Sequence, residues 1–200
     1  GIVTLFYAPE ILHSEYALRL IRSQAEQGVD CLAVTADVFT SLSDKDNPQG
    51  MLAIVRQNLT KLETLNPDNF AWGVGLVAPQ DPGNLGAILR TIDAVGASGL
   101  LLLDSNLDVY HPSAVRASMG SLFWCPVVEA TFEEFVSWSR RRGYTIYGTS
   151  AHASLDYRQV GRYESHRILL MGSERQGLTE EQSAACDALI NLPMRGRATS

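Results

Sequence analysis

Apolar and polar positions alternate along the chain in blocks that predict strands and helices in turn. From Ala71 onward, short apolar runs typical of buried strands are separated by segments with helical spacing. We expect strands at 72–78, 100–103, 145–149, 168–171 and 188–192, a further apolar run at 122–128, and helices at 84–95, 112–119, 132–141 and 179–186. This alternation favours an α/β fold with a mostly parallel sheet covered on both faces.

The first 70 residues form a separate block. Strands are expected at 2–7 and 31–35, a helix at 15–27 and another apolar run at 51–55. The stretch Ser41–Gly50 is polar and contains Pro48 and Gly50, which interrupt regular structure. Asn66-Pro67-Asp68 is a linker signal. We therefore predict an N-terminal domain at 1–60, a linker at 61–70 and a second domain at 71–200.

The segment Ala78–Arg90, APQDPGNLGAILR, joins a turn to the start of a helix, and Asn84 is the expected N-cap. Apolar residues recur at helical spacing on one face: Leu85, Ile88, Leu89, Ile92 and Val95. Arg90 lies roughly 140° from Leu85, at about 100° per residue, and so faces away from the core. Taken alone, Arg90 is an exposed side chain that pairs with Asp93 three residues later.

Two later segments have the glycine and polar residues of ligand-binding loops. In Leu170–Leu178, LMGSERQGL, a strand runs into Gly172, with Glu174 and Gly177 following. In Asn191–Ser200, NLPMRGRATS, a strand runs into a proline and two arginines. Glycine permits a close approach of backbone to ligand, and ligands gather at the carboxyl ends of parallel strands. Each loop alone is an ordinary connection.

Charge and composition change this picture little. The net charge is −6, which argues mildly against a nucleic-acid partner. Residues 90–200 hold 11 basic and 12 acidic side chains, so this part is nearly balanced. Of the 16 basic residues 14 are arginines, whose planar fork suits phosphate. The dense basic run Arg140–Arg142 is expected to be the solvated last turn of a helix, where cations complement the helix dipole.

The remaining chemistry-bearing residues predict no metal site and no disulfides. Three cysteines far apart in sequence, with no signal-peptide pattern, favour reduced thiols in a cytoplasmic protein. No apolar run is long enough for a membrane span. The four histidines lack ligand spacing and are expected on the surface or in loops: His13, His111, His152 and His166.

Taken together, PGNLGAILRT, MGSERQGL and NLPMRGRATS occur in the order and spacing of three motifs, and the chain resembles the SpoU (TrmH-like) branch of the SPOUT methyltransferases. VRASMGSLF and the upstream SDKDNPQGMLAIV also match, so the resemblance covers roughly residues 10–200. It implies an α/β-knot fold with a deep C-terminal trefoil knot and a mostly parallel sheet. It also implies a partial N-terminal ribosomal-protein-like α/β domain that binds the substrate.

The resemblance implies transfer of a methyl group from S-adenosylmethionine to a ribose 2′-hydroxyl of RNA, with ribosomal RNA slightly favoured over transfer RNA, by a homodimer. Matched position by position, the cofactor would contact Gly172, Leu192, Met194, Leu170 and Ser200. The catalytic group would comprise Arg90, Asn84, Glu174 and Ser200, with Arg116 and Arg90 contacting RNA. The family motif continues beyond Ser200 and the chain begins within a strand, so we expect further residues at both ends.

Three alternatives remain at this point. One stays within the same enzyme class, an antibiotic-resistance or tRNA-directed relative that differs only in its substrate. A SPOUT-fold protein that binds RNA without catalysis would share the fold, but it would not need Arg90, Asn84 and Glu174 together. A dinucleotide-dependent oxidoreductase would need G-x-G-x-x-G after the first strand of the second domain, and Gly73–Gly86 does not provide that spacing.

Overall fold

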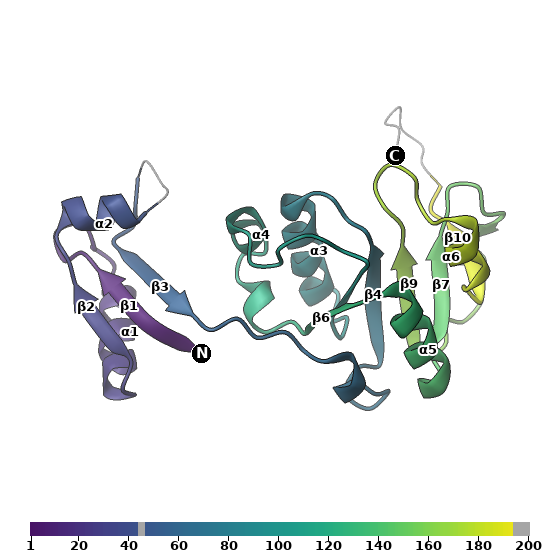
Figure 1. Ribbon diagram of the computed structural model, residues 1–200, viewed down its shortest axis with the longest axis horizontal. Helices are drawn as coiled ribbons and strands as arrows, with labels where there is room; N and C mark the ends of the chain where they lie inside the picture. The colour runs from purple at the N-terminus through teal and green to yellow at the C-terminus, as the bar shows by residue number, and fades with distance from the viewer. Residues whose placement is uncertain (44–46, 194–200) are drawn as a thin grey trace. The chain divides into compact units, whose positions relative to one another are not determined.

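The computed structural model of the chain describes residues 1–43 and 47–193, and it divides the chain into two compact units (Figure 1). Unit 1 comprises Gly1–Asn58 and unit 2 comprises Leu59–Ser200. The segment 61–70, predicted as a linker, contributes the buried side chains of Leu65 and Phe70 to the core of unit 2. Two predicted site residues, Met194 and Ser200, lie outside the described residues.

Unit 1 is a small α/β unit with a three-stranded sheet in the order β2-β1-β3. Strand β1 pairs with β2 in parallel and with β3 in antiparallel orientation. Its elements are β1 (Ile2–Tyr7), α1 (Glu15–Glu26), β2 (Asp30–Ala33), α2 (Ala36–Leu42) and β3 (Met51–Val55). Helix α2 was not predicted, because its seven residues span only two turns and show no clear apolar spacing.

Unit 2 is built on a seven-stranded sheet whose paired strands are all parallel, in the order β6-β5-β4-β9-β7-β10-β8. Its strands are β4 (Trp72–Val77), β5 (Leu100–Leu103), β6 (Val127–Ala130), β7 (Thr145–Thr149), β8 (Leu155–Asp156), β9 (Arg167–Met171) and β10 (Ala188–Asn191). Its helices are α3 (Pro82–Ala94), α4 (Pro112–Ala117), α5 (Phe132–Arg142) and α6 (Glu180–Ala184), with 3-10 turns η1 (Leu62–Thr64), η2 (Ser121–Phe123) and η3 (Tyr157–Gln159). The predicted parallel α/β architecture is confirmed, and the knot stays a prediction.

Helices cover this sheet from both sides, which explains its continuous apolar strands. In β5, Leu101 and Leu103 join the core around Trp138 of α5, whereas Leu100 and Leu102 join the core around Leu89 of α3. All four leucines are at most 1% exposed. A strand buried on both faces reads as an unbroken apolar run rather than an alternating one, as the sequence of β5 does.

The three cysteines form no disulfide in the structure, and two of them are poorly reactive. Burial raises the pKa of Cys125 to about 11, with a smaller contribution from Asp93. Burial and the charge of Asp187 likewise raise the pKa of Cys186 to about 11. Both thiols are therefore neutral near pH 7 and poorly suited to nucleophilic chemistry.

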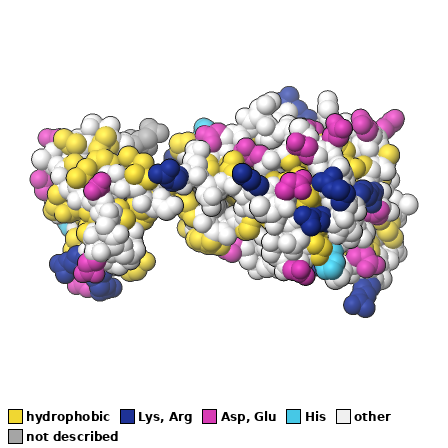
Figure 2. Space-filling view, turned by 60° about the horizontal axis from the view of Figure 1, so that its bottom comes forward, with side chains coloured by type: hydrophobic (Ala, Val, Ile, Leu, Met, Phe, Trp, Pro, Cys, Tyr) yellow, Lys and Arg dark blue, Asp and Glu magenta, His cyan; other side chains and the backbone are white. Residues whose placement is uncertain are grey.

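The basic run Arg140–Arg142 is the exposed last turn of α5, as expected, and two of its arginines also form ion pairs. Arg140 pairs with Asp187 at 2.7 Å and donates to the carbonyl of Ala185, so it ties α5 to the segment before β10. Arg141 pairs with Glu63 in η1 at 3.3 Å. On the face in Figure 2, the Lys and Arg side chains of unit 2 lie among Asp and Glu side chains, without one continuous basic field.

We expect Arg140→Met to lower the free energy of unfolding by about 1 kcal/mol, because both partners of the ion pair are partly exposed and screened by solvent. The measurement is the urea midpoint at moderate salt. Arg162→Met, at a residue that forms no ion pair in the described structure, is the matched control and should leave the midpoint unchanged. Equal midpoints for the two variants would show that the Arg140 contacts add nothing.

Candidate active site at the carboxyl edge of the sheet

The predicted motif loops meet at one edge of the sheet because β4, β9, β7 and β10 are neighbouring parallel strands. The carboxyl ends of such strands lie on the same side, where α/β sheets bind ligands. The loop after β4 leads into α3, the loop after β9 contains Gly172 and Glu174, and the chain after β10 contains Leu192.

Helix α3 begins two residues earlier than predicted, and its N-cap is Asp81 rather than Asn84. The carboxylate of Asp81 accepts a hydrogen bond from the Asn84 backbone N–H at 2.7 Å. Pro82 occupies the first helical turn, where its fixed φ and missing N–H are favourable, so the helix can start before Asn84. The Asn84 side chain is thereby free of the capping role and lies at the pocket described below.

Glu174 links the loop after β9 to the loop after β4. Its carboxylate oxygens accept from the backbone N–H of Gln80 at 3.2 and 3.3 Å. Partial burial alone would raise the pKa of Glu174. Hydrogen bonds from its own backbone, from Gln80 and Asp81 and from the Asn84 side chain hold that pKa below the usual value. Glu174 is therefore a carboxylate near neutral pH, fixed against the start of α3.

The loop after β9 is closed so tightly that Gly172 can carry no side chain. A Cβ at this position would lie 2.0 Å from the carbonyl carbon of Gly177 and 2.2 Å from its oxygen. The loop is held by a bridge between Ser173 and Gly177, with the Gly177 N–H donating to the Ser173 carbonyl at 2.9 Å. The neighbouring atoms are backbone, which cannot move aside as a side chain would.

A pocket of about 320 Å³ lies between this loop and α3. It has apolar walls and a few polar groups, and it is lined by Leu76, Pro79, Asn84, Leu85, Ala87, Ile88, Thr91, Met171, Gly172 and Glu174. Pockets of this size and lining suit small organic ligands. Three predicted site residues, Asn84, Gly172 and Glu174, thus share one pocket.

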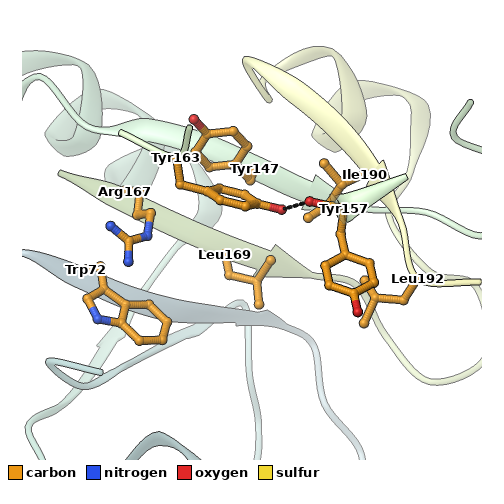
Figure 3. Close-up of a pocket in the computed structure, with 8 residues that line it drawn as sticks. All are labelled: Trp72, Tyr147, Tyr157, Tyr163, Arg167, Leu169, Ile190 and Leu192. Carbon is orange, nitrogen blue, oxygen red and sulfur yellow. Dashed lines mark hydrogen bonds between the residues drawn. The ribbon is translucent and has the colours of Figure 1, made fainter. Parts of the chain in front are cut away.

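Leu192 and Leu170 lie elsewhere. Leu192 is 55% exposed and borders a second pocket, shown in Figure 3, which is lined mainly by aromatic side chains of β4, β7 and the segment before β9. There the guanidinium of Arg167 lies 5.0 Å from the ring centre of Trp72, and Tyr163 donates to the Tyr157 carbonyl. The Leu170 side chain is fully buried in the α5 core, so only its backbone faces the carboxyl edge.

Arg90 is exposed, and the expected pairing with Asp93 is not formed. The Asp93 carboxylate instead accepts from the indole N–H of Trp124 at 2.9 Å. Within the described part of the chain, no ion pair or hydrogen bond engages the guanidinium of Arg90 or that of Arg116. Both cations are therefore available to an external anion.

The segment after β7 was missed as part of this edge. The Asn191 side chain donates to the carbonyls of Ala151 and Ala153, both at 3.2 Å, and Thr149 donates to the Leu170 carbonyl at 3.3 Å. The small and polar residues GTSAHAS that follow the apolar run of β7 could have indicated a loop at a strand's carboxyl end. Among the described residues, no group of three or more His, Cys, Asp or Glu is arranged to hold a metal ion. No helix in that same set is long and apolar enough to cross a bilayer.

Similarity to known proteins agrees with this geometry. The model of the SpoU rRNA Methylase family matches residues 72–200. A 23S rRNA (uridine(2479)-2′-O)-methyltransferase of Streptomyces viridochromogenes is 33% identical over 205 residues, covering 98% of this chain and 70% of that protein. A 23S rRNA (guanosine(2553)-2′-O)-methyltransferase of Bacillus subtilis is 31% identical over 181 residues, covering 90% of this chain and 70% of that protein.

Solved structures give the same result. The AdoMet-bound rRNA methyltransferase from Sinorhizobium meliloti superposes with a TM-score of 0.87 at 34% identity, over all of this chain and 74% of that one. The SpoU methyltransferase AviRb from S. viridochromogenes, in complex with the cofactor AdoMet, superposes with a TM-score of 0.84 at 30% identity. The match covers all of this chain and 77% of the AviRb chain. The chain therefore belongs to the SpoU rRNA methylase family.

Proposed function

We propose that this protein transfers a methyl group from S-adenosylmethionine to a ribose 2′-hydroxyl of ribosomal RNA. The observation that carries the proposal is the shared pocket of Asn84, Gly172 and Glu174 beside α3, the helix that bears Arg90. The relatives named above act on 23S rRNA and match nearly the whole of this chain. The 2′-hydroxyl distinguishes RNA from DNA, so DNA of the same sequence is not a substrate.

The pocket fits the methyl donor in chemical character. Its apolar walls suit the uncharged parts of the cofactor. S-adenosylmethionine supplies, when bound, a methyl group already activated by its positive sulfur. Gly172 lines the pocket without a side chain. The motif resemblance also assigns cofactor contacts to Leu192, Met194, Ser200 and the backbone of Leu170; Leu192 borders the second pocket rather than this one, so these contacts stay predictions.

The protein's own task is to orient the ribose and to stabilise negative charge on its oxygen. We assign this charge stabilisation to Arg90, which stays protonated and so acts as an electrostatic group rather than a free base. Asn84 and Glu174 position the start of α3. Arg116 is assigned to an RNA phosphate, and the proton leaves to water or to that phosphate.

The assembly is proposed to be a cytoplasmic homodimer, with the N-terminal domain at 1–60 binding substrate RNA. Support for the dimer comes from α3, whose exposed small residues Ala87, Thr91 and Ala94 permit a close approach of a second copy. Ala87 and Thr91 also line the pocket, so a second copy in this place would border the pocket.

The proposed function is tested by incubating the full-length protein with tritiated S-adenosylmethionine and total RNA from cells that lack the gene. After the RNA classes are separated, we expect label in ribosomal RNA. Label confined to transfer RNA would contradict the proposed substrate. Cofactor binding without label in any RNA would favour the alternative of a SPOUT-fold protein that binds RNA without catalysis.

Glu174→Ala is expected to lower kcat about tenfold while the KM for S-adenosylmethionine changes less, because the start of α3 loses its anchor. Glu174→Gln keeps an oxygen that can accept the hydrogen bond from Gln80, so its kcat should lie between those of wild type and Glu174→Ala. Glu181→Gln, an exposed acid in α6, is the control. If the KM of Glu174→Ala for S-adenosylmethionine rises by as large a factor as its kcat falls, Glu174 instead contacts the cofactor.

The lowered pKa of Glu174 fixes the direction of its pH dependence. The folded-state pKa lies below the ordinary value, so the carboxylate's contribution is present above about pH 4.5 and is lost as the pH falls through the lower folded-state pKa. We expect wild-type kcat to be flat with respect to this group from pH 6 to 8 and to fall only in acid. A pH profile that titrates near 6 and disappears in Glu174→Gln would contradict this assignment.

A further inference from the structure

An unusual group of large apolar side chains is exposed on the α4–η2 segment of unit 2. Met119, Phe123 and Trp124 lie within six residues of each other in sequence, and they are 72%, 54% and 61% exposed. Exposed apolar side chains grouped on one segment mark interaction sites more often than single ones do. We refer to Met119, Phe123 and Trp124 as the platform.

The Trp124 side chain of the platform is held in place by contacts with Asp93 and Gly120. The Trp124 indole N–H is held by Asp93 of α3, and the edge of its ring lies against Gly120, where an added Cβ would come within 3.1 Å of two ring carbons. Gly120 has φ 99°, and Met119 has φ 50°, a conformation that is rare for a residue with a side chain. The structure thus holds the indole in one orientation while leaving most of it open.

Three residues on one stripe of α3 place Arg90 beside this platform. Gly86, Arg90 and Asp93 are spaced four and three residues apart, which puts them on the same side of the helix. At one end of the stripe, Gly86 packs against α4, where an added Cβ would lie 2.4 Å from the Ala114 carbonyl oxygen. At the other end, Asp93 binds Trp124. Arg90 therefore lies between the end of α4 and the indole.

The charges around the platform favour an anionic, aromatic ligand. Arg90 and Arg116, in the last turn of α4, have no partner in the described structure, and the carboxylate of Asp93 is engaged by the indole. Unpaired RNA combines flat bases, which stack on aromatic side chains, with phosphates, which bind arginine.

We propose that the platform stacks an unpaired base of the substrate RNA, adjacent to the nucleotide whose ribose reaches Arg90. This inference rests on the proposed function, because it places the platform next to the reacting ribose. It implies that the target nucleotide lies in a single-stranded loop or bulge, since bases in an A-form helix are stacked on each other and cannot reach a protein ring. Specificity for the RNA then comes partly from a base beside the one that is modified.

The test measures RNA binding by tryptophan fluorescence, without methyl transfer. The chain has three tryptophans; Trp138 is fully buried and Trp72 half-buried, so Trp124 is the one most open to a base. Single-stranded oligonucleotides of each base are expected to quench the fluorescence of the full-length protein, whereas blunt double-stranded RNA is not. Trp124→Phe should abolish the quench, and its affinity for single-stranded RNA should stay within about threefold of wild type, because an aromatic ring is kept.

Trp124→Ala is expected to weaken single-strand binding by about 5- to 100-fold, with cofactor affinity unchanged. Val95→Ala is the matched control, because Val95 is 58% exposed and lies roughly 200° from Asp93 at about 100° per residue. Absence of quenching by every single-stranded probe would overturn the inference. So would a Trp124→Ala variant whose oligomeric state changes while its RNA affinity does not, since the platform would then join copies of the chain.

Failure of this inference is distinguishable from failure of the proposed function. A wild-type protein that methylates RNA, with the same RNA affinity after Trp124→Ala, overturns only the platform. A protein that binds single strands through Trp124 and transfers no methyl group to any RNA overturns the proposed reaction and leaves the platform standing.

Discussion

Arg90→Ala is expected to reduce kcat/KM for methyl transfer by at least about 100-fold, the loss seen when one stabilising donor is removed from a developing oxyanion. The guanidinium is exposed and has no partner in the described structure, so its removal should cost the fold little. The measurement is steady-state methylation of ribosomal RNA. Calorimetric titration with S-adenosylmethionine and thermal unfolding serve as controls, and both should match wild type.

Two further variants sharpen this result. Arg90→Lys keeps the charge but loses the planar fork, and its rate should lie between wild type and Arg90→Ala. Arg116→Ala removes the neighbouring cation, and we expect it to raise the KM for RNA several-fold with kcat unchanged, as a phosphate contact would. Activity of Arg90→Ala within threefold of wild type would remove Arg90 from the catalytic group.

Gly172→Ala is expected to weaken S-adenosylmethionine binding at least tenfold, or about 1.4 kcal/mol. A Cβ would overlap the Gly177 carbonyl at 2.0 Å, so the loop after β9 must open. Opening this loop displaces Glu174 from Gln80 and changes the wall of the pocket. The direct measurement is the cofactor dissociation constant by calorimetry.

The matched control for Gly172 lies in the same loop. Gly177 has φ 67°, and a Cβ there would meet no atom within 4 Å. Asparagine tolerates this left-handed conformation, so Gly177→Asn should bind cofactor nearly as wild type does. If Gly172→Ala binds as tightly as Gly177→Asn, the closed loop is not needed for the cofactor.

Much of the fold could be predicted because local and global preferences agree. The four leucines of β5 are apolar without interruption, and the buried face of α3 repeats at helical spacing. The predicted start of α3 was wrong, because Asp81 and Asn84 are both suitable N-cap residues. The structure shows that Asp81 is the N-cap and that Pro82 occupies the first turn. Strand β8 has two residues, too few for any periodic signal.

The candidate site was less accessible from sequence. That Glu174 contacts Gln80, 94 positions away, depends on β4 and β9 being neighbours, which no local pattern encodes. The motif resemblance predicted Asn84, Gly172 and Glu174 as site residues, and all three line one pocket in the structure. The Trp124 contact with Asp93 could not be foreseen, because Asp93 was expected to pair with Arg90.

The chemical position of the label shows whether the methyl group is placed on a ribose oxygen of ribosomal RNA. Ribosomal RNA labelled by the full-length protein with tritiated S-adenosylmethionine is hydrolysed in alkali, which needs a free 2′-hydroxyl to cleave the chain. We expect the tritium in an alkali-resistant dinucleotide, with none when Arg90→Ala replaces the wild type. Tritium released in mononucleotides would place the methyl group on a base and rule out 2′-O-methylation.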